Sequence, residues 1–122
     1  MTGPSRLRAG DFVYVDLEPR KGTEQDGYRP ALVISEAEYH LHSRRAFICP
    51  ITRNVEPYPT KVVLPEGLLV TGAVLLDQAR SVDRAARGMR ILGAAPPSLL
   101  WTVRARLAML IGLSPPPRSD EP

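Results

Sequence analysis

Three side chains of this sequence could together transfer protons and bind a phosphate. Glu24 and Arg29 are five residues apart in a polar stretch, and Thr52 ends an apolar run. A carboxylate can accept a proton, a guanidinium can bind two phosphate oxygens at once, and a hydroxyl can donate one more hydrogen bond. A plainer interpretation stays open, in which Arg29 pairs with Glu24 on the surface and Thr52 is an ordinary strand-end residue.

Other kinds of catalytic site are not indicated. The sequence contains no Gly-rich phosphate loop ahead of a helix and no Gly-x-Ser-x-Gly motif. Cys49 is the single cysteine, and His40 and His42 lie one residue apart in a polar connection, which is typical of solvated histidines. One cysteine and two histidines are too few for a structural zinc site. We therefore expect no metal and no cofactor.

The basic residues are mostly arginine: they make up 14 of the 16 basic side chains, and the formal net charge is +3. Arginine suits bidentate contacts to phosphate, although a genome rich in G and C gives the same composition. Arg80, Arg84, Arg87 and Arg90 are spaced by four, three and three residues, with Asp83 among them. This run fits a loop followed by a strand, and forms either a basic rim that contacts phosphates or a salt-bridged turn.

The elements that would position these residues are mainly strands. Alternating or continuous apolar runs predict strands at residues 11–17, 30–35, 46–51, 60–64, 72–76 and 89–92. A polar loop covers residues 18–28, and residues 36–45 include at most a helical turn. Short strands separated by Gly and Pro predict a small antiparallel β-barrel rather than alternating β-α units.

One amphipathic helix is predicted at residues 97–112. Its apolar stripe, which we expect to face the core, consists of Leu99, Leu100, Val103, Leu107, Leu110 and Ile111. Two prolines suit the first turn, and Gly112 suits the end. Trp101 falls on the opposite side, where it is either exposed by accident or part of a subunit contact.

The length of 122 residues indicates one domain. We assign residues 1–8 to a flexible N-terminal segment, 9–112 to the folded domain and 113–122 to a proline-rich, disordered tail. No stretch approaches the roughly 18 consecutive apolar residues of a membrane span, and the N-terminus lacks the apolar region of a signal peptide. We expect a cytoplasmic protein.

Four motifs, in order, resemble the MazF/PemK/Kid family over residues 9–112. They are Gly10-Asp11, the Lys21-Gly22 to Arg29-Pro30 loop, Pro50-Ile51-Thr52, and the polar run from Asp77-Gln78 through Arg80-Ser81 and Asp83 to Arg87-Gly88. Members of this family are toxins of type II toxin–antitoxin pairs and ribosome-independent mRNA endonucleases. The resemblance implies a small SH3-like antiparallel β-barrel with a C-terminal helix, of the CcdB/PemK type, that forms homodimers.

The resemblance assigns catalysis to Arg29 and Thr52, with Glu24 as a third participant. Because the 2′-hydroxyl of RNA supplies the nucleophile, cleavage needs a proton acceptor, charge stabilisation at phosphorus and a donor for the leaving oxygen. Glu24 is either the acceptor or the group that orients Arg29. The expected products carry a 2′,3′-cyclic phosphate and a 5′-hydroxyl.

The expected partners are single-stranded mRNA and a MazE-like antitoxin, whose acidic and apolar C-terminal segment would fold on binding. The residues expected to bind RNA are Lys21, Gln25, Tyr28, Arg53, Gln78, Arg80, Ser81 and Arg87.

Two alternatives change the function but keep the fold. CcdB toxins, which poison DNA gyrase, share this barrel but end in Trp-Gly-Ile, whereas this chain ends in a proline-rich, acidic segment. A non-catalytic RNA- or peptide-binding barrel is the second alternative, and the presence of Glu24, Arg29 and Thr52 counts against it.

Overall fold

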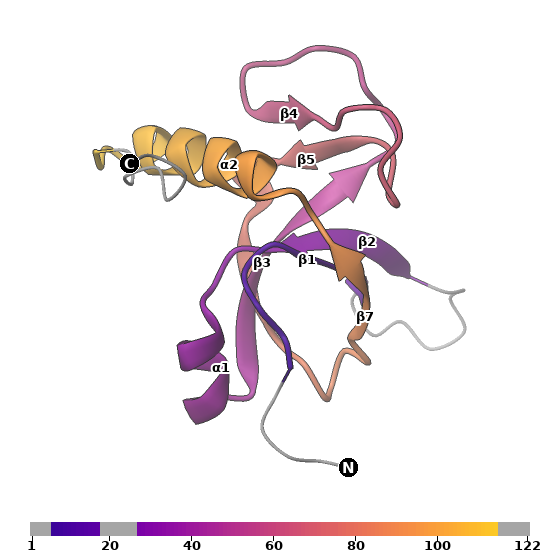
Figure 1. Ribbon diagram of the computed structural model, residues 1–122, viewed down its shortest axis with the longest axis vertical. Helices are drawn as coiled ribbons and strands as arrows, with labels where there is room; N and C mark the ends of the chain where they lie inside the picture. Colours follow the sequence, from indigo (N-terminus) through magenta and orange to yellow (C-terminus); the bar gives the residue numbers. More distant parts are fainter. Residues whose placement is uncertain (1–5, 18–26, 115–122) are drawn as a thin grey trace.

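The computed structural model describes residues 6–17 and 27–114. Its strands are β1 (Asp11–Asp16), β2 (Tyr28–Val33), β3 (Arg45–Thr52), β4 (Lys61–Val63), β5 (Ala73–Leu75), β6 (Arg80–Asp83) and β7 (Arg90–Ala94). Its helices are α1 (Ala37–His42), the short 3₁₀ helix η1 (Leu76–Gln78) and α2 (Pro97–Leu110). Figure 1 shows α2 beside the curled sheet. No helix within the described ranges has the length and apolar character needed to cross a membrane.

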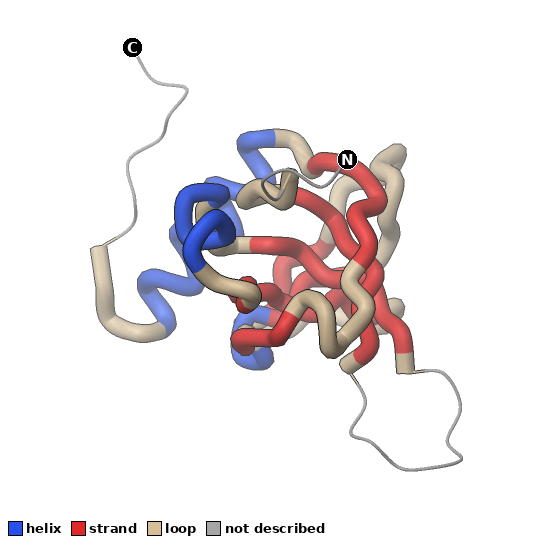
Figure 2. The backbone as a smooth tube through the Cα atoms, turned by 90° about the horizontal axis from the view of Figure 1, so that it is seen from below, coloured by secondary structure: helices blue, strands red, loops and turns tan. Residues whose placement is uncertain are grey.

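The strands pair antiparallel in the order β4-β5-β3-β2-β1-β7, and β6 pairs with β3. The long strand β3 changes partner along its length: residues 45–48 face β6, whereas Ile51 and Thr52 face β5. The sheet curls strongly (Figure 2), but no pairing among the described residues joins β7 to β4. The predicted barrel is therefore an open one, because β7 leads directly into α2 rather than to the opposite edge.

Both faces of the central strands are buried, and each face contributes to its own apolar cluster. Phe12 of β1 belongs to the cluster that contains Leu99 and Val103 of α2. Val13 and Val15 point to the opposite face, where they belong to the cluster that contains Leu7. This matches the alternation predicted for β1. Cys49 lies in the cluster under α2, and burial raises the pKa of its thiol to about 12.

The predicted apolar stripe of α2 is only partly correct. Leu99 and Val103 are buried, whereas Leu110 is 48% and Ile111 64% exposed. The sheet packs against the first turns of the helix, and the last turn extends past it (Figure 1), so those side chains have nothing to pack against in one chain. Trp101, expected on the exposed side, is half-buried.

Strand β6 corrects the expectation of a loop at the start of the arginine run. Its four residues, Arg80–Asp83, pair with the first half of β3, and only Val82 is buried. A strand with one apolar residue carries little alternation signal. The strand forms because the free edge of β3 supplies backbone hydrogen-bond partners.

His40 is buried, not solvated as predicted. Its Nδ1 lies 3.0 Å from the Leu7 carbonyl oxygen, and its Nε2 lies 2.7 Å from the Ser35 hydroxyl oxygen. A carbonyl only accepts, so Nδ1 donates to the Leu7 carbonyl oxygen, and Nε2 forms the second hydrogen bond with the Ser35 hydroxyl. The ring therefore ties the segment before β1 to α1. His42 is exposed, as expected.

Candidate active site

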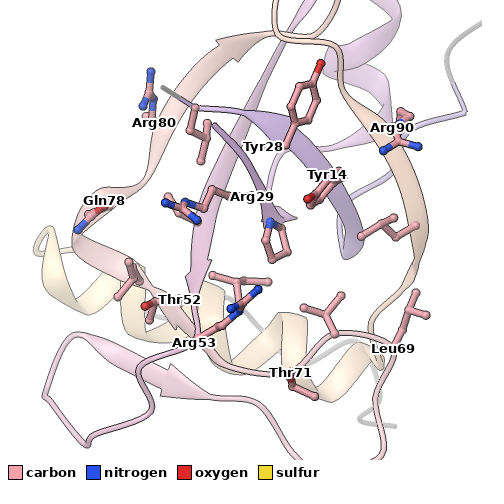
Figure 3. A pocket seen from close by; sticks show the side chains of 17 residues that line it. Tyr14, Tyr28, Arg29, Thr52, Arg53, Leu69, Thr71, Gln78, Arg80 and Arg90 are labelled. Atoms are coloured by element: carbon pink, nitrogen blue, oxygen red, sulfur yellow. The ribbon is translucent and has the colours of Figure 1, made fainter. Parts of the chain in front are cut away.

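An open pocket of about 1110 Å³ lies where the ends of β2 and β3 meet β1, β7 and the η1–β6 segment (Figure 3). Six residues predicted for the site line this pocket: Tyr28, Arg29, Thr52, Arg53, Gln78 and Arg80. They come from three separate parts of the sequence, and the antiparallel pairing of β2 with β3 brings the first three residues together. Glu24, Gln25 and Lys21 lie outside the described residues.

The pocket carries unbalanced positive charge. Its lining contains four exposed arginines, Arg29, Arg53, Arg80 and Arg90. Among the described residues, none of their guanidinium groups has a hydrogen-bond or ion-pair partner, and no described lining residue is acidic. This arrangement favours a polyanion.

Several arginines outside the pocket are engaged within the chain. Arg44 lies 3.1 Å from the Asp83 carboxylate, and Arg104 lies 2.8 Å from Glu36. Arg84 donates to the backbone carbonyls of the α1–β3 connection. Exposed Arg6 and Arg8 also have no side-chain partner among the described residues, so what distinguishes the four pocket arginines is that they line one pocket.

Two predicted RNA-binding residues lie apart from the pocket lining. The Ser81 hydroxyl accepts a hydrogen bond from Arg45 Nε at 2.7 Å, and Arg87 donates to the Asp16 carbonyl at 3.4 Å. Side chains alternate along a strand, so Arg80 and Ser81 of β6 project from opposite faces. Arg80 therefore reaches the pocket and Ser81 does not.

Thr52 is the last residue of β3 and is half-buried. Its hydroxyl oxygen accepts a hydrogen bond from the Asn54 backbone N–H at 3.1 Å. Because the oxygen already accepts, the hydroxyl hydrogen is left to donate toward the pocket. Gly72 lies against this residue: a Cβ on Gly72 would be 2.2 Å from the Thr52 carbonyl oxygen. Only glycine permits this approach.

Arg29 lies on β2, opposite Val15 of β1. Figure 3 shows it between Thr52 and Gln78 on one side and Tyr14 on the other. The Arg29 guanidinium on β2 and the Thr52 hydroxyl on β3 can therefore donate hydrogen bonds to the same bound phosphate.

Sequence reasoning gave no role to Tyr14, Leu69 or Thr71, which also line the pocket. Tyr14 follows Phe12 on the same face of β1, and Phe12 is in the core. A polar aromatic residue two positions after a core residue marks the rim of that core, and this signal could have identified Tyr14. Leu69 and Thr71 are in a connection without a readable pattern.

A small, mainly antiparallel β protein with an arginine-lined pocket defines a class of protein suited to bind a polyanion. Residues 8–111 match the model of the PemK-like, MazF-like toxin family of type II toxin–antitoxin systems. The chain belongs to this family. The predicted family and its mainly β architecture with a C-terminal helix are thereby confirmed.

Similar proteins carry endoribonuclease names. The chain is 38% identical over 103 residues to the endoribonuclease toxin MazF of Escherichia coli K12, covering 84% of this chain and 92% of the relative. It is 30% identical over 111 residues to the endoribonuclease PemK of Escherichia coli, covering 88% and 84%. These relatives confirm the predicted enzyme class, endoribonuclease, and do not favour the gyrase alternative.

Solved structures agree with the sequence comparisons. A crystal structure of MazE-MazF from Deinococcus radiodurans matches with a TM-score of 0.82 and 41% identity, covering 88% of this chain and 97% of the matched chain. A second crystal form of MazF from the same organism matches with a TM-score of 0.78 and 40% identity, again covering 88% and 97%.

Proposed function

We propose that this chain is a ribosome-independent, sequence-specific toxin that cleaves single-stranded mRNA without a metal ion. The observation that supports this most directly is the meeting of Arg29 and Thr52 in a pocket lined by four arginines that have no hydrogen-bond or ion-pair partner among the described residues. An RNA phosphodiester supplies the negative charge that would balance these arginines.

The chemistry is a transesterification within the RNA. The 2′-oxygen attacks phosphorus, the bond from phosphorus to the 5′-oxygen breaks, and a 2′,3′-cyclic phosphate remains. The 2′-hydroxyl loses its proton to a base, and the departing 5′-oxygen gains one from a donor. The products are the cyclic phosphate and a 5′-hydroxyl, with no water consumed in this step.

Arg29 and Thr52 act on the phosphate itself. The fork of Arg29 binds the non-bridging oxygens, whose negative charge increases in the transition state. The hydroxyl of Thr52, positioned by the Asn54 N–H, donates to the same group. Glu24 either accepts the 2′-proton or orients Arg29. The substrate provides its own nucleophile, so no metal-bound water is required.

The rest of the RNA lies along the pocket. Arg53, Gln78 and Arg80 bind neighbouring phosphates and sugars, and Tyr28 contacts a base. Lys21 and Gln25 complete the contacts from the β1–β2 connection. Ser81 and Arg87 act indirectly, since both already bond within the chain.

The protein works as a cytoplasmic homodimer that a MazE-like antitoxin neutralises. The exposed apolar side chains at the end of α2, Met109, Leu110, Ile111 and Leu113, support a second subunit there. The unbalanced arginines of the pocket suit the acidic C-terminal segment of an antitoxin as well as RNA.

Mapping the cleavage ends of a long RNA treated with purified protein tests the proposal. We expect cuts at one short sequence, cyclic phosphate and 5′-hydroxyl ends, and unchanged activity in excess EDTA. Loss of activity in EDTA would contradict the metal-free chemistry. Inhibition of gyrase supercoiling with intact RNA would instead support the gyrase alternative.

A further inference from the structure

We propose that Tyr14, Tyr28 and Arg90 form a nucleobase-stacking subsite on the pocket wall, one step along the RNA from the scissile phosphate. The proposal rests on the proposed RNA cleavage and adds to it a place where one unstacked base is held. Tyr14, Tyr28 and Arg90 together form this stacking row.

Strand register places the stacking row on one face of the sheet. Tyr14 of β1 lies directly opposite Arg90 of β7. Tyr28 of β2 lies opposite Asp16, which is two residues from Tyr14 and therefore on the same face. The three side chains thus come from three adjacent strands and point into the same pocket.

The side chains of the stacking row lie within contact distance of one another. The rings of Tyr14 and Tyr28 have centroids 5.5 Å apart and an interplanar angle of 32°. The Arg90 guanidinium carbon lies over the Tyr14 ring, 5.5 Å from its centroid. Among the described residues this is the sole partner of the Arg90 side chain, which is exposed. Among the described residues, Arg90 is therefore positioned by an aromatic ring and not by a carboxylate.

Gly88 fixes the far end of the row. It has φ of +60°, and a Cβ there would lie 2.3 Å from the Tyr28 hydroxyl oxygen. The tyrosine hydroxyl therefore sits directly over the glycine, in space that any other residue would fill. This packing limits the positions open to the Tyr28 ring, so the row is preorganised.

The position of the row suits a base next to the cleaved bond. Figure 3 shows Tyr14, Tyr28 and Arg90 on one side of the pocket, Gln78 and Thr52 on the other, and Arg29 between them. RNA-binding proteins hold splayed bases against aromatic rings and guanidinium planes. An acidic peptide would need the charge of Arg90 but not two neighbouring aromatic rings, so a nucleobase is the better occupant.

An abasic scan of a short RNA tests the stacking row. The substrate is an oligonucleotide that contains the mapped cleavage site, in which each flanking nucleotide in turn is replaced by an abasic ribose. At one flanking position we expect the abasic change to lower kcat/KM of the wild type about tenfold or more. The same change should have little effect on Tyr14→Ala, since the base has already lost its contact.

Matched variants separate stacking from folding. Tyr14→Phe keeps the aromatic ring and should retain the effect of the abasic change at that position. Tyr39→Ala is the control, since it removes a tyrosine that stacks on Phe47 outside the pocket lining. Arg90→Gln, at an exposed position, should reduce the same positional effect even if Tyr14→Ala fails to fold.

The outcomes are distinct. If each abasic substitution lowers kcat/KM of the wild type and of Arg90→Gln by the same factor, the proposed stacking row is wrong. The same result, with weaker binding of an acidic antitoxin peptide by Arg90→Gln, would assign the row to the protein partner and also overturn it. A wild type that leaves the unmodified oligonucleotide intact would refute the proposed RNA cleavage itself.

Discussion

An arginine binds RNA only if the fold leaves its guanidinium free. Arg45 and Arg80 both lie on strands and both are exposed, yet Arg45 bonds to Ser81 while Arg80 faces the pocket without a described partner. Releasing Arg45 would require breaking bonds to the Ser81 hydroxyl and carbonyl oxygens. Breaking these hydrogen bonds would reduce the free energy gained on binding phosphate. Arginines without such bonds are therefore the better ligands for phosphate.

Arg29→Ala should lower kcat by about 100- to 1000-fold, because removal of one preorganised donor to a charged transition state has this order of effect. Arg29→Lys keeps the positive charge but loses the bidentate geometry of the guanidinium, so its kcat should lie between those of the wild type and Arg29→Ala. Arg29 has no described side-chain partner, so the thermal midpoint should be unchanged. Steady-state kinetics on the mapped oligonucleotide measure this.

Arg106→Ala is the matched control, since Arg106 is exposed and donates only a long 3.4 Å hydrogen bond to the Lys61 carbonyl. Cleavage by Arg29→Ala at the rate of this control would remove Arg29 from the mechanism.

At the scale of elements, the site depends on how β3 ends and how β5 begins beside it. Thr52 is opposite Ala73, and Gly72 precedes that pair with φ of +128°. The Gly72 carbonyl also accepts the Leu64 N–H at 2.9 Å, which holds the two strands of the β4–β5 hairpin together. The position of the Thr52 hydroxyl is thus set by a turn far from it in the sequence.

Gly72→Ala should destabilise the protein by roughly 1–3 kcal/mol and reduce cleavage, because the new Cβ meets the Thr52 carbonyl and the backbone is strained. Gly67→Ala introduces comparable strain at φ of +87° where no atom lies within 4 Å. Urea unfolding and cleavage rates of the two variants can be compared directly. Equal losses in both would show that contact with Thr52 is unimportant.

The turn after β6 contributes stability that depends on pH. The Asp83 carboxylate accepts hydrogen bonds from the backbone of Ala86 and Ala85, each at 3.0 Å, and pairs with Arg44. The Ala86 N–H bond is the largest cause that lowers the pKa of Asp83 below its ordinary 3.8. A lowered folded-state pKa means that this stabilisation is present above 3.8 and is lost as the pH falls through the folded-state value.

Asp83→Asn should therefore reduce stability at neutral pH and weaken its further loss on acidification. Urea unfolding of the wild type and the variant, from neutral pH into the acid range, measures both effects. An unchanged difference between them at every pH would refute this role of Asp83.

For the whole molecule, the important feature is an asymmetric charge distribution on a nearly neutral chain. A net charge of only +3 is combined with four free arginines around one pocket. Outside the pocket, two arginines pair with carboxylates, Arg44 with Asp83 and Arg104 with Glu36. The field is therefore concentrated where RNA is proposed to bind.

Binding of single-stranded RNA should weaken with salt, with a slope of log K against log salt of about −3 if all four arginines contact phosphates. A substrate with 2′-deoxyribose at the cleaved position stays intact and allows binding to be measured. Replacing Arg53 and Arg80 together with Gln should reduce the slope by about half. A slope near zero in the wild type would contradict phosphate binding by the pocket.

The sequence by itself determined the strands with strong alternation, the helix, the order of family motifs, and Arg29 and Thr52 as candidates. These are local properties, because alternation and helical period are set by neighbouring residues. The tertiary structure decided that β6 forms, that the last turn of α2 stays exposed, that Ser81 leaves the pocket, and that Tyr14 joins it. Each of these depends on partners far away in the chain: Arg45 and Ser81 are 36 residues apart. A sequence pattern records which way a side chain points from its strand, but only packing decides what it meets.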